Sequence, residues 1–270
     1  MKGKIPLFWW SETRLMNKAR ENYGDLLSWF LVKEISRRPV EWVHPKKKPW
    51  YRKKRKHYLV IGSILHHATE KSIVWGSGII DMSHPVPAAS FLAVRGPRTR
   101  NYLINRGYTC PEIFGDPALL LPQFYSPIIE KKYKLGIVPH YHDYQIVKER
   151  YEGEVEVLVV DIMTMRIEEV TDKILSCEQV ISSSLHGIIV SHAYEIPCVW
   201  VKFSNRLFGD GVKFLDYLES VQLPVYEPSF LAEKLPVEEL ETLLRKNPAL
   251  PEQAIVNDLQ NGLLNSCPFR

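Results

Sequence analysis

Short apolar runs and longer amphipathic stretches alternate along the whole chain. Within residues 25–35, apolar side chains such as Leu26, Leu27 and Phe30 recur at helical spacing. Residues 97–105 open with a proline and are followed by a glycine at position 107, as helices often are. The pattern predicts helices over these two ranges and strands over residues 5–10, 57–62, 73–75 and 91–94.

A second alternation begins after a connector at residues 122–132. Its predicted strands are residues 133–138, 155–160, 179–182 and 198–201, and its predicted helices are residues 142–151, 167–175, 185–194, 213–219, 237–246 and 251–264. Strands that alternate with helices are typical of helix-covered parallel sheets. We therefore expect an α/β fold of two Rossmann-like lobes, residues 1–127 and 128–270, with a cleft between them. The final helix would pack back on the first lobe.

Composition narrows the class of protein. The 270 residues are 45% hydrophobic and 24% charged, which excludes a disordered or collagen-like chain. No apolar run approaches the roughly 20 residues that cross a bilayer, and the N-terminus does not resemble a secretory signal. The four cysteines lie far apart without a C-x-x-C pair, so we expect reduced thiols, no zinc site and a cytoplasmic protein.

The net charge of +4 has a local origin. Eight basic residues and no acid lie between Lys46 and Lys56, which we call the basic strap. The rest of the chain contains 27 of the 35 basic residues and 31 acidic residues, so the chain outside the basic strap is mildly acidic. Prolines and aromatics interrupt the basic strap and disfavour a long helix. It fits a solvated loop, an anionic membrane surface or nucleic acid, in a chain that is otherwise not basic.

The most informative segment joins a predicted strand to an apolar helix through three serines, Ser182, Ser183 and Ser184. Ligands of open α/β sheets bind at the carboxyl ends of strands, and the first turn of the next helix favours anions. The hydroxyls could cap that helix or bind a phosphate. His186 falls in its first turn, and Gly187 would allow a ligand close to the backbone. An ordinary serine-capped core helix is the alternative interpretation.

A second histidine cluster ends the predicted strand 133–138. His140, followed by Tyr141 and His142, occupies a position equivalent to that of His186, so the two could meet in one cleft. Asp143 fits a helix cap. Histidines at this spacing, without cysteines, do not form a usual metal site.

Three further segments contain residues typical of ligand sites. Asn22 and Asp25 open a predicted helix, where Asp25 is either a cap or a base. Gly76 and Ser77 follow a predicted strand but lack the third glycine of a dinucleotide fingerprint. Arg95 ends a strand and fits either a carboxylate or phosphate clamp or a surface arginine. The absence of G-x-S-x-G and P-loop motifs disfavours hydrolases and NTPases.

Together these segments resemble the polysaccharide pyruvyltransferase family, in order and over residues 20–220. The matching segments are Asn22-Tyr23-Gly24-Asp25, Gly76-Ser77-Gly78, Val94-Arg95-Gly96-Pro97, Gly115-Asp116-Pro117-Ala118, Gly136-Ile137-Val138-Pro139-His140-Tyr141, Ser182-Ser183-Ser184-Leu185-His186-Gly187 and Lys213-Phe214-Leu215-Asp216-Tyr217. The serine-rich segment is the most specific. The likeness is to the bacterial branch that builds pyruvate ketals on exopolysaccharide or capsule repeat units.

One departure concerns the donor. The yeast branch has an arginine before its Leu-His pair that holds phosphoenolpyruvate, and Ser184 occupies that position here. The resemblance therefore leaves a missing positive charge, for which Arg95 and Lys202 are our candidates.

The resemblance implies a glycosyltransferase-B-like pair of lobes, phosphoenolpyruvate as donor and a glycan acceptor, with a lipid-diphosphate carrier as one form. No metal or redox cofactor and no nucleic acid partner is implied. An acid would protonate the methylene carbon, and two sugar hydroxyls would replace phosphate in a cyclic ketal. The residues implied are His186, His140 and Asp25 for catalysis, and Arg95, Ser183, Ser184, Leu185, Gly187, Lys202, Asn22, Gly76 and Ser77 for substrate binding.

Two other functions fit the same pattern. A nucleotide-sugar-dependent glycosyltransferase would share the two-lobed fold, because a fold does not fix a function. A non-enzymatic module that binds a membrane or nucleic acid through the basic strap would need the motifs only for structure. If the strap binds membranes, the enzyme would sit on the inner face of the plasma membrane.

Overall fold

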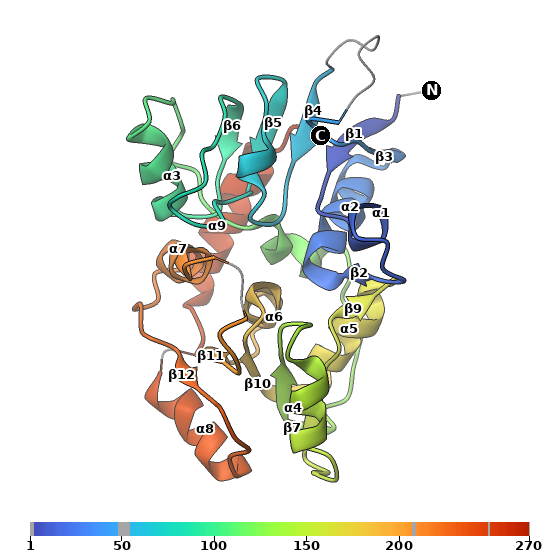
Figure 1. The fold of residues 1–270 in the computed structure, drawn as a ribbon, viewed down its shortest axis with the longest axis vertical. Coiled ribbons are helices and arrows are strands. Elements are labelled where there is room, and N and C mark those ends of the chain that lie inside the picture. Colours follow the sequence, from blue (N-terminus) through green and yellow to red (C-terminus); the bar gives the residue numbers. More distant parts are fainter. Residues whose placement is uncertain (1–2, 48–54, 207–208, 248, 270) are drawn as a thin grey trace.

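The computed structural model describes residues 3–47, 55–206, 209–247 and 249–269. Within these ranges the chain forms two five-stranded parallel sheets, one above the other in Figure 1, with helices between and around them. The α/β class predicted from the sequence is confirmed.

The strands of each sheet run parallel to their neighbours. The first sheet has the order β3-β1-β4-β5-β6 and the second the order β12-β11-β10-β7-β8. Their bounds are β1 (Ile5–Phe8), β3 (Val40–Trp42), β4 (His57–Leu59), β5 (Ser72–Trp75), β6 (Ser90–Ala93), β7 (Tyr133–Val138), β8 (Val157–Val159), β10 (Cys177–Ser182), β11 (Cys198–Lys202) and β12 (Ser229–Phe230). Helices cover both faces of such sheets, which explains why their central strands are nearly continuous apolar runs.

The remaining elements are mostly helical. They are α1 (Glu12–Leu15), α2 (Tyr23–Ser36), η1 (Leu65–His67), α3 (Pro97–Ile104), η2 (Pro117–Gln123), α4 (Tyr144–Arg150), α5 (Ile167–Leu175), α6 (Leu185–Ala193), α7 (Val212–Ser220), α8 (Val237–Lys246) and α9 (Gln253–Asn265). A short antiparallel pair joins β2 (Glu21–Asn22) to β9 (Met163–Thr164).

Helix α6 lies at the centre of the molecule, between the two sheets (Figure 1). All nine of its residues are buried, the polar His186, Ser191 and His192 among them. One continuous core contains Leu27 and Leu31 of α2, Ile188 and Ile189 of α6 and Leu120 of η2. Side chains from both halves of the chain therefore share one core around α6.

The C-terminal helix packs on the first sheet. The indole Nε1 of Trp75, in β5, donates a hydrogen bond to the carbonyl of Leu263 at 3.0 Å. The ring of Phe269 meets the ring of Trp75 edge-on, with centroids 5.7 Å apart. The last segment of the chain thus closes against the strands formed by the first hundred residues.

Several predicted elements have the observed bounds, among them the strand β7, whereas α2 and α9 are displaced by one or two residues at their ends. Helices α5 and α8 have the predicted bounds. The predicted strand 57–62 ends earlier, at Leu59, because the chain turns at Gly62, whose φ is +104°. The strand β3 was not predicted, since its three residues carry too short a pattern.

Most of the basic strap lies outside the described residues. Of its eight basic residues, Lys46, Lys47, Arg55 and Lys56 are described. The Lys46 ammonium donates to the carbonyl of His66 at 2.8 Å, and Arg55 pairs with Glu41 at 2.6 Å. Among the helices that the structure describes, none combines the length and the apolar character needed to cross a bilayer.

Candidate active site

A cavity of about 520 Å³ opens where the carboxyl ends of the strands of both sheets face each other. Its lining includes the segments that follow β1, β4, β7 and β10, together with the first turns of α2, α6 and α7. The lining residues are Trp10, Glu12, Asn22, Asp25, Gly62, Ser63, Ile64, His66, His67, Ile80, His140, Tyr141, Ser184, Leu185, His186 and Lys213. This is the position at which open parallel sheets bind ligands.

The three serines after β10 have different roles. The Ser182 hydroxyl donates to the carbonyl of Val138 at 2.8 Å, and the Ser183 hydroxyl accepts from the backbone N–H of His140 at 2.9 Å. Both side chains are fully buried and tie β10 to the end of β7. Ser184, at the N-cap of α6, lines the cavity, whereas Ser183 does not. Ser183 therefore holds the loop of His140, and its binding of substrate stays a prediction.

His186 faces a buried carboxylate. Its Nε2 lies 3.5 Å from Oδ2 of Asp116, a side chain with no solvent exposure. The other oxygen of Asp116 accepts from the backbone N–H of Ala118 and caps η2. Within the described ranges neither His186 Nε2 nor Asp116 Oδ2 makes a hydrogen bond. Oδ2 of Asp116 is therefore free to accept a hydrogen bond from an Nε2–H group. Nδ1 of His186 could then exchange a proton with a ligand.

Helix α2 supports the opposite edge of the His186 ring. Asn22 caps this helix by accepting from the N–H of Gly24 at 3.0 Å. The Nδ1 edge of His186 lies directly over Gly24, where any added Cβ would overlap the ring. The glycine in the Asn22–Asp25 segment thus allows α2 and α6 to approach each other at the cavity.

The carboxyl group of Asp25 is hard to ionise. Its pKa is raised to about 8, chiefly because burial removes it from water and further because Glu12 and Glu21 lie nearby. The ammonium of Lys213 acts in the opposite direction. Asp25 is therefore largely protonated at neutral pH and titrates close to it.

Lys213 brings a positive charge into the cavity. Its pKa is lowered to about 8, chiefly by burial and further by the nearby guanidinium of Arg95, while Asp25 acts in the opposite direction. It stays mostly charged at pH 7. Sequence reasoning missed this residue as a site candidate; its position in the first turn of a helix after Gly211 was the available signal.

Three histidines of the cavity lining, His140, His66 and His67, are neutral at pH 7. Burial lowers the pKa of His140 to about 3, assisted by Lys213, His142 and Lys18. Burial likewise lowers the pKa of His66 to about 4 and that of His67 to about 3. His140 lines the cavity beside His186, as expected from their equivalent positions, but in the free protein it offers hydrogen bonds rather than charge.

One wall of the cavity is aromatic. The rings of Trp10 and His67 are stacked, with centroids 5.6 Å apart. The Trp10 indole donates to Glu12 at 3.2 Å, and Glu12 pairs with Lys18 at 2.8 Å. Lys18 also lies 4.1 Å from the ring centroid of Tyr141, which comes from the other sheet. These contacts hold a flat apolar surface with polar edges at the cavity.

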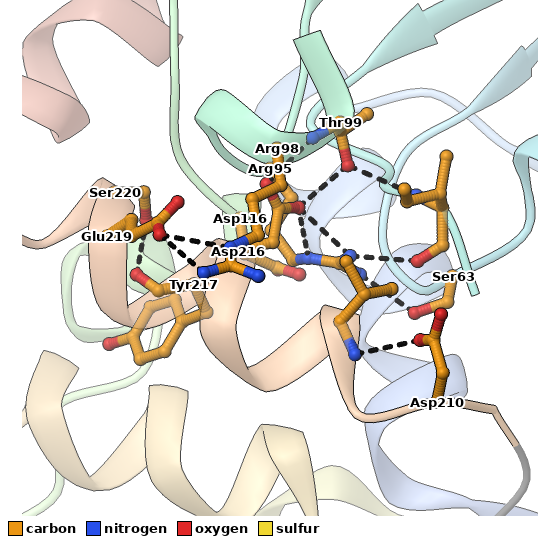
Figure 2. Close-up of polar contacts among 12 residues, drawn as sticks. Ser63, Arg95, Arg98, Thr99, Asp116, Asp210, Asp216, Tyr217, Glu219 and Ser220 are labelled. Carbon is orange, nitrogen blue, oxygen red and sulfur yellow. Dashed lines mark hydrogen bonds and ion pairs between the residues drawn. The ribbon is translucent and has the colours of Figure 1, made fainter. Parts of the chain in front are cut away.

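Arg95 does not line the cavity as a free cation, contrary to the prediction. Its guanidinium is fully buried and is bound by Asp216, by the Ser63 hydroxyl and by the carbonyl of Ile79 (Figure 2). The charge is neutralised by a partner 121 residues away in the chain. The contacts that the structure shows for Arg95 are structural, and its predicted role as a donor clamp has no support from them.

Four other predicted binding residues also lie outside the cavity lining. Lys202 lies over the ring of Trp200, 5.5 Å from its centroid. Gly76 has a φ of +94° and leaves space for Pro117, and Gly187 leaves space for Ser182 and Val138. Ser77 is fully buried, and its carbonyl accepts from the N–H of Arg95. The cavity therefore does not bring Lys202, Gly76, Ser77 and Gly187 together with His186, and their ligand contacts stay predictions.

The predicted residues that the cavity does bring together are His186, His140, Asp25, Asn22, Ser184 and Leu185. Sequence reasoning did not single out Asp116, whose segment was noted only as part of a motif. No group of three or more His, Cys, Asp or Glu side chains suited to a metal ion occurs in the described part of the chain.

Comparisons with known proteins give one family and one relative. A sequence model of the polysaccharide pyruvyl transferase family matches residues 22–205, more than half of the chain. An uncharacterized protein of Acanthamoeba polyphaga mimivirus is 36% identical over 173 residues. That alignment covers 60% of this chain and 59% of the viral protein, so the match spans little more than half of that relative.

Proposed function

Because the chain belongs to the polysaccharide pyruvyl transferase family, we propose that it transfers pyruvate from phosphoenolpyruvate to two hydroxyls of a glycan, forming a cyclic ketal. The observation that carries this proposal is the cavity itself. It combines the His186–Asp116 pair, a carboxyl group that titrates near neutrality and one buried ammonium. These groups match the needs of the reaction: an acid, a base and a cation for an anionic donor.

The donor would bind between α6 and α7. Phosphoenolpyruvate carries a phosphate and a carboxylate, and Lys213 supplies a mostly charged ammonium at neutral pH. The backbone N–H groups of the first turn of α6 and the hydroxyl of Ser184 favour an anion at the same place. The neutral imidazole of His140 adds a hydrogen bond without a second charge. Lys213 therefore takes the role that the sequence had suggested for Arg95 and Lys202.

His186 is the proposed acid. With Asp116 accepting from Nε2, the proton on Nδ1 of the imidazolium would move to the methylene carbon of the donor, which becomes a methyl group. C2 becomes cationic, and the first sugar hydroxyl forms a C–O bond there while losing its proton. The bond from C2 to the phosphate oxygen then breaks, and the phosphate leaves with the electron pair. The second hydroxyl closes the ketal and releases its own proton.

Asp25 is the proposed base for the hydroxyls. A carboxylate whose pKa is near 8 accepts a proton far better than one with an ordinary pKa, and its value lies near the pH at which it would work. Asn22 caps the helix that carries Asp25 and lines the same cavity, so it contributes by fixing this turn.

The acceptor would bind against the aromatic wall of Trp10, His67 and Tyr141. Aromatic faces with polar edges suit sugar rings, which have apolar faces and hydroxyl rims. The facing carboxyl ends of two parallel sheets support a glycosyltransferase-B-like arrangement with lobes 1–127 and 128–270. In this proposal the first sheet holds the acceptor and the second holds the donor.

The basic strap suggests where the enzyme works. A glycan carried on a lipid diphosphate lies at a membrane, and eight basic residues exceed what one compact donor needs. We propose a cytoplasmic enzyme that binds the anionic inner face of the plasma membrane through Lys46–Lys56.

The test is a phosphate-release assay with phosphoenolpyruvate and a panel of galactosides, glucosides and mannosides. Phosphate release that needs both donor and acceptor supports the proposal. Nucleotide release from a sugar nucleotide, with phosphoenolpyruvate inert, would show the rival glycosyltransferase instead. His186→Ala controls for contaminating phosphatases.

A further inference from the structure

A buried polar network joins the end of the first sheet to helix α7, next to the cavity (Figure 2). The carboxylate of Asp216, in α7, accepts from Nε of Arg95 at 3.0 Å and also pairs with Nη2 at 3.0 Å. Both side chains are completely buried. Arg95 is held in three directions, because it also donates to the hydroxyl of Ser63 at 2.7 Å and to the carbonyl of Ile79 at 2.9 Å.

Asp216 also completes a helix that is not its own. Helix α3 has glycine at its N-cap, so no side chain of its own satisfies the first-turn N–H groups. The Asp216 carboxylate accepts from the backbone N–H of Thr99 at 2.9 Å and from its hydroxyl at 2.7 Å. One carboxylate of α7 therefore caps α3 and neutralises Arg95 at the same time.

Two glycines set how closely these parts fit. A Cβ at Gly96 would overlap the backbone carbonyl of Asp216, and a Cβ at Gly78 would overlap the guanidinium of Arg95. The position of α7 relative to the first sheet is thus fixed at van der Waals contact along both sides of the ion pair.

The network reaches the cavity at two points. Ser63, which Arg95 binds, is a lining residue. Lys213 is also a lining residue, and it precedes Asp216 by one turn of α7, which places the two on the same side of that helix. Asp25 from α2, Arg95 from the end of β6 and His140 from the loop after β7 are the titratable or charged groups that act on Lys213.

We propose that Arg95 and Asp216 form a positioning clasp that locks α7 against the first sheet and so fixes the ammonium of Lys213 and the hydroxyl of Ser63 in the cavity. The role of the clasp in donor binding rests on the proposed function. Its effect on the surroundings of Lys213 does not depend on which reaction the protein catalyses.

The chain contains a matched control for the clasp. Arg98 and Glu219 join the same two helices, with Nε and Nη2 of Arg98 at 3.0 and 2.8 Å from one carboxylate oxygen. That pair is partly exposed, and neither of its residues lines the cavity. If the clasp merely ties α3 to α7, breaking either pair should have the same effect on Lys213. If it positions Lys213, breaking Arg95–Asp216 should have an effect that breaking Arg98–Glu219 does not.

The test compares Arg95→Lys and Asp216→Asn with Arg98→Gln. Lysines are reductively methylated with ¹³C-formaldehyde, the Lys213 signal is assigned with Lys213→Arg, and its pKa is measured without substrate. We expect the Lys213 pKa to shift in both clasp variants, and downwards in Asp216→Asn because Arg95 then keeps an uncompensated positive charge, whereas it should stay unchanged in Arg98→Gln. The KM for phosphoenolpyruvate should increase about 10-fold or more in the clasp variants and less than about 2-fold in the control.

Equal behaviour of all three variants, or folded clasp variants with an unchanged Lys213 pKa and KM, would overturn the proposal. If both clasp variants fail to fold, two milder variants replace them. Thr99→Val removes one hydrogen-bond donor to Asp216, and Ser63→Ala removes one hydrogen-bond acceptor of Arg95. An unchanged Lys213 pKa in both would also overturn the proposal. A shifted Lys213 pKa in an enzyme that uses no phosphoenolpyruvate would support the clasp while refuting the proposed reaction.

Discussion

His186 is the residue on which the proposed chemistry depends most. Replacing it with alanine removes the acid and takes the imidazole away from Oδ2 of Asp116, whose other oxygen still caps η2. We expect kcat to fall by roughly two to four orders of magnitude while the protein stays folded. His142→Ala is the control, because that exposed histidine follows the neighbouring strand β7 but does not line the cavity. A His186→Ala variant that retains the parental kcat would remove the residue from the mechanism.

The pH profile tests the two groups that titrate near neutrality. Asp25 must be ionised to act as base, so kcat/KM for the donor should rise as pH increases towards about 8. Lys213 must be protonated to hold the donor, so the same quantity should fall as pH increases beyond about 8.

Substitutions should assign each limb of that profile. Lys213→Arg keeps its charge at high pH and should move the falling limb to higher pH. Asp25→Asn should lower kcat and remove the rising limb. A profile that both substitutions leave unchanged would contradict these roles.

Sequence reasoning succeeded for residues whose position follows from one strand end, and it failed where a distant partner decides the role. His186 and His140 line the cavity and follow local strand-to-helix patterns, and Asp25 lines it from the first turn of a predicted helix. Arg95 follows a strand end in the same way, but the pairing with Asp216 is tertiary and no local pattern contains it. Asp116 was overlooked for the same reason, since its partner is 70 positions further along the chain.

At the scale of elements, the contact between α2 and α6 is unusually sensitive to volume. Glycine inside a helix normally costs stability relative to alanine, so Gly24→Ala would ordinarily stabilise α2. Here the new Cβ overlaps the ring of His186. We expect the free energy of unfolding to fall by about 1–3 kcal/mol and activity to fall with it, because the ring or the helix must move.

Gly262→Ala provides the comparison for that substitution. It lies inside α9, and its Cβ would sit 3.5 Å from a methyl group of Ile113, an ordinary contact. We expect this variant to gain about 0.5–1 kcal/mol and to keep its activity. Chemical denaturation of both variants measures the difference, and a stabilised, active Gly24→Ala would show that α2 and α6 are not closely fitted at the site.

Element length explains which parts of the fold could be predicted. Helices α5 and α8 carry two or more turns of regular apolar spacing and were predicted with their observed bounds. The β2–β9 pair contains two residues per strand and β3 contains three, too few for a periodic signal. Their partners come from other parts of the chain, which the local pattern does not reveal.

At the scale of the whole molecule, charge is unevenly distributed. If the basic strap binds the membrane, the protein should co-sediment with vesicles that contain phosphatidylserine and much less with neutral phosphatidylcholine. Binding should weaken steeply as salt rises. Changing Arg52, Lys53, Lys54, Arg55 and Lys56 to serine should abolish the preference for anionic lipid. Equal binding of parent and variant would leave Lys46–Lys56 as a solvated loop.

The central claim is that the enzyme protonates the methylene carbon of phosphoenolpyruvate and leaves a pyruvate ketal on a sugar. The most direct test is to run the reaction in D2O with an acceptor that supports phosphate release, and to analyse the product by NMR and mass spectrometry. The account predicts a cyclic ketal whose methyl group carries one deuterium from solvent, and no such product with His186→Ala. A product without solvent deuterium in the methyl group, or an acceptor that gains a sugar instead of pyruvate, would contradict it.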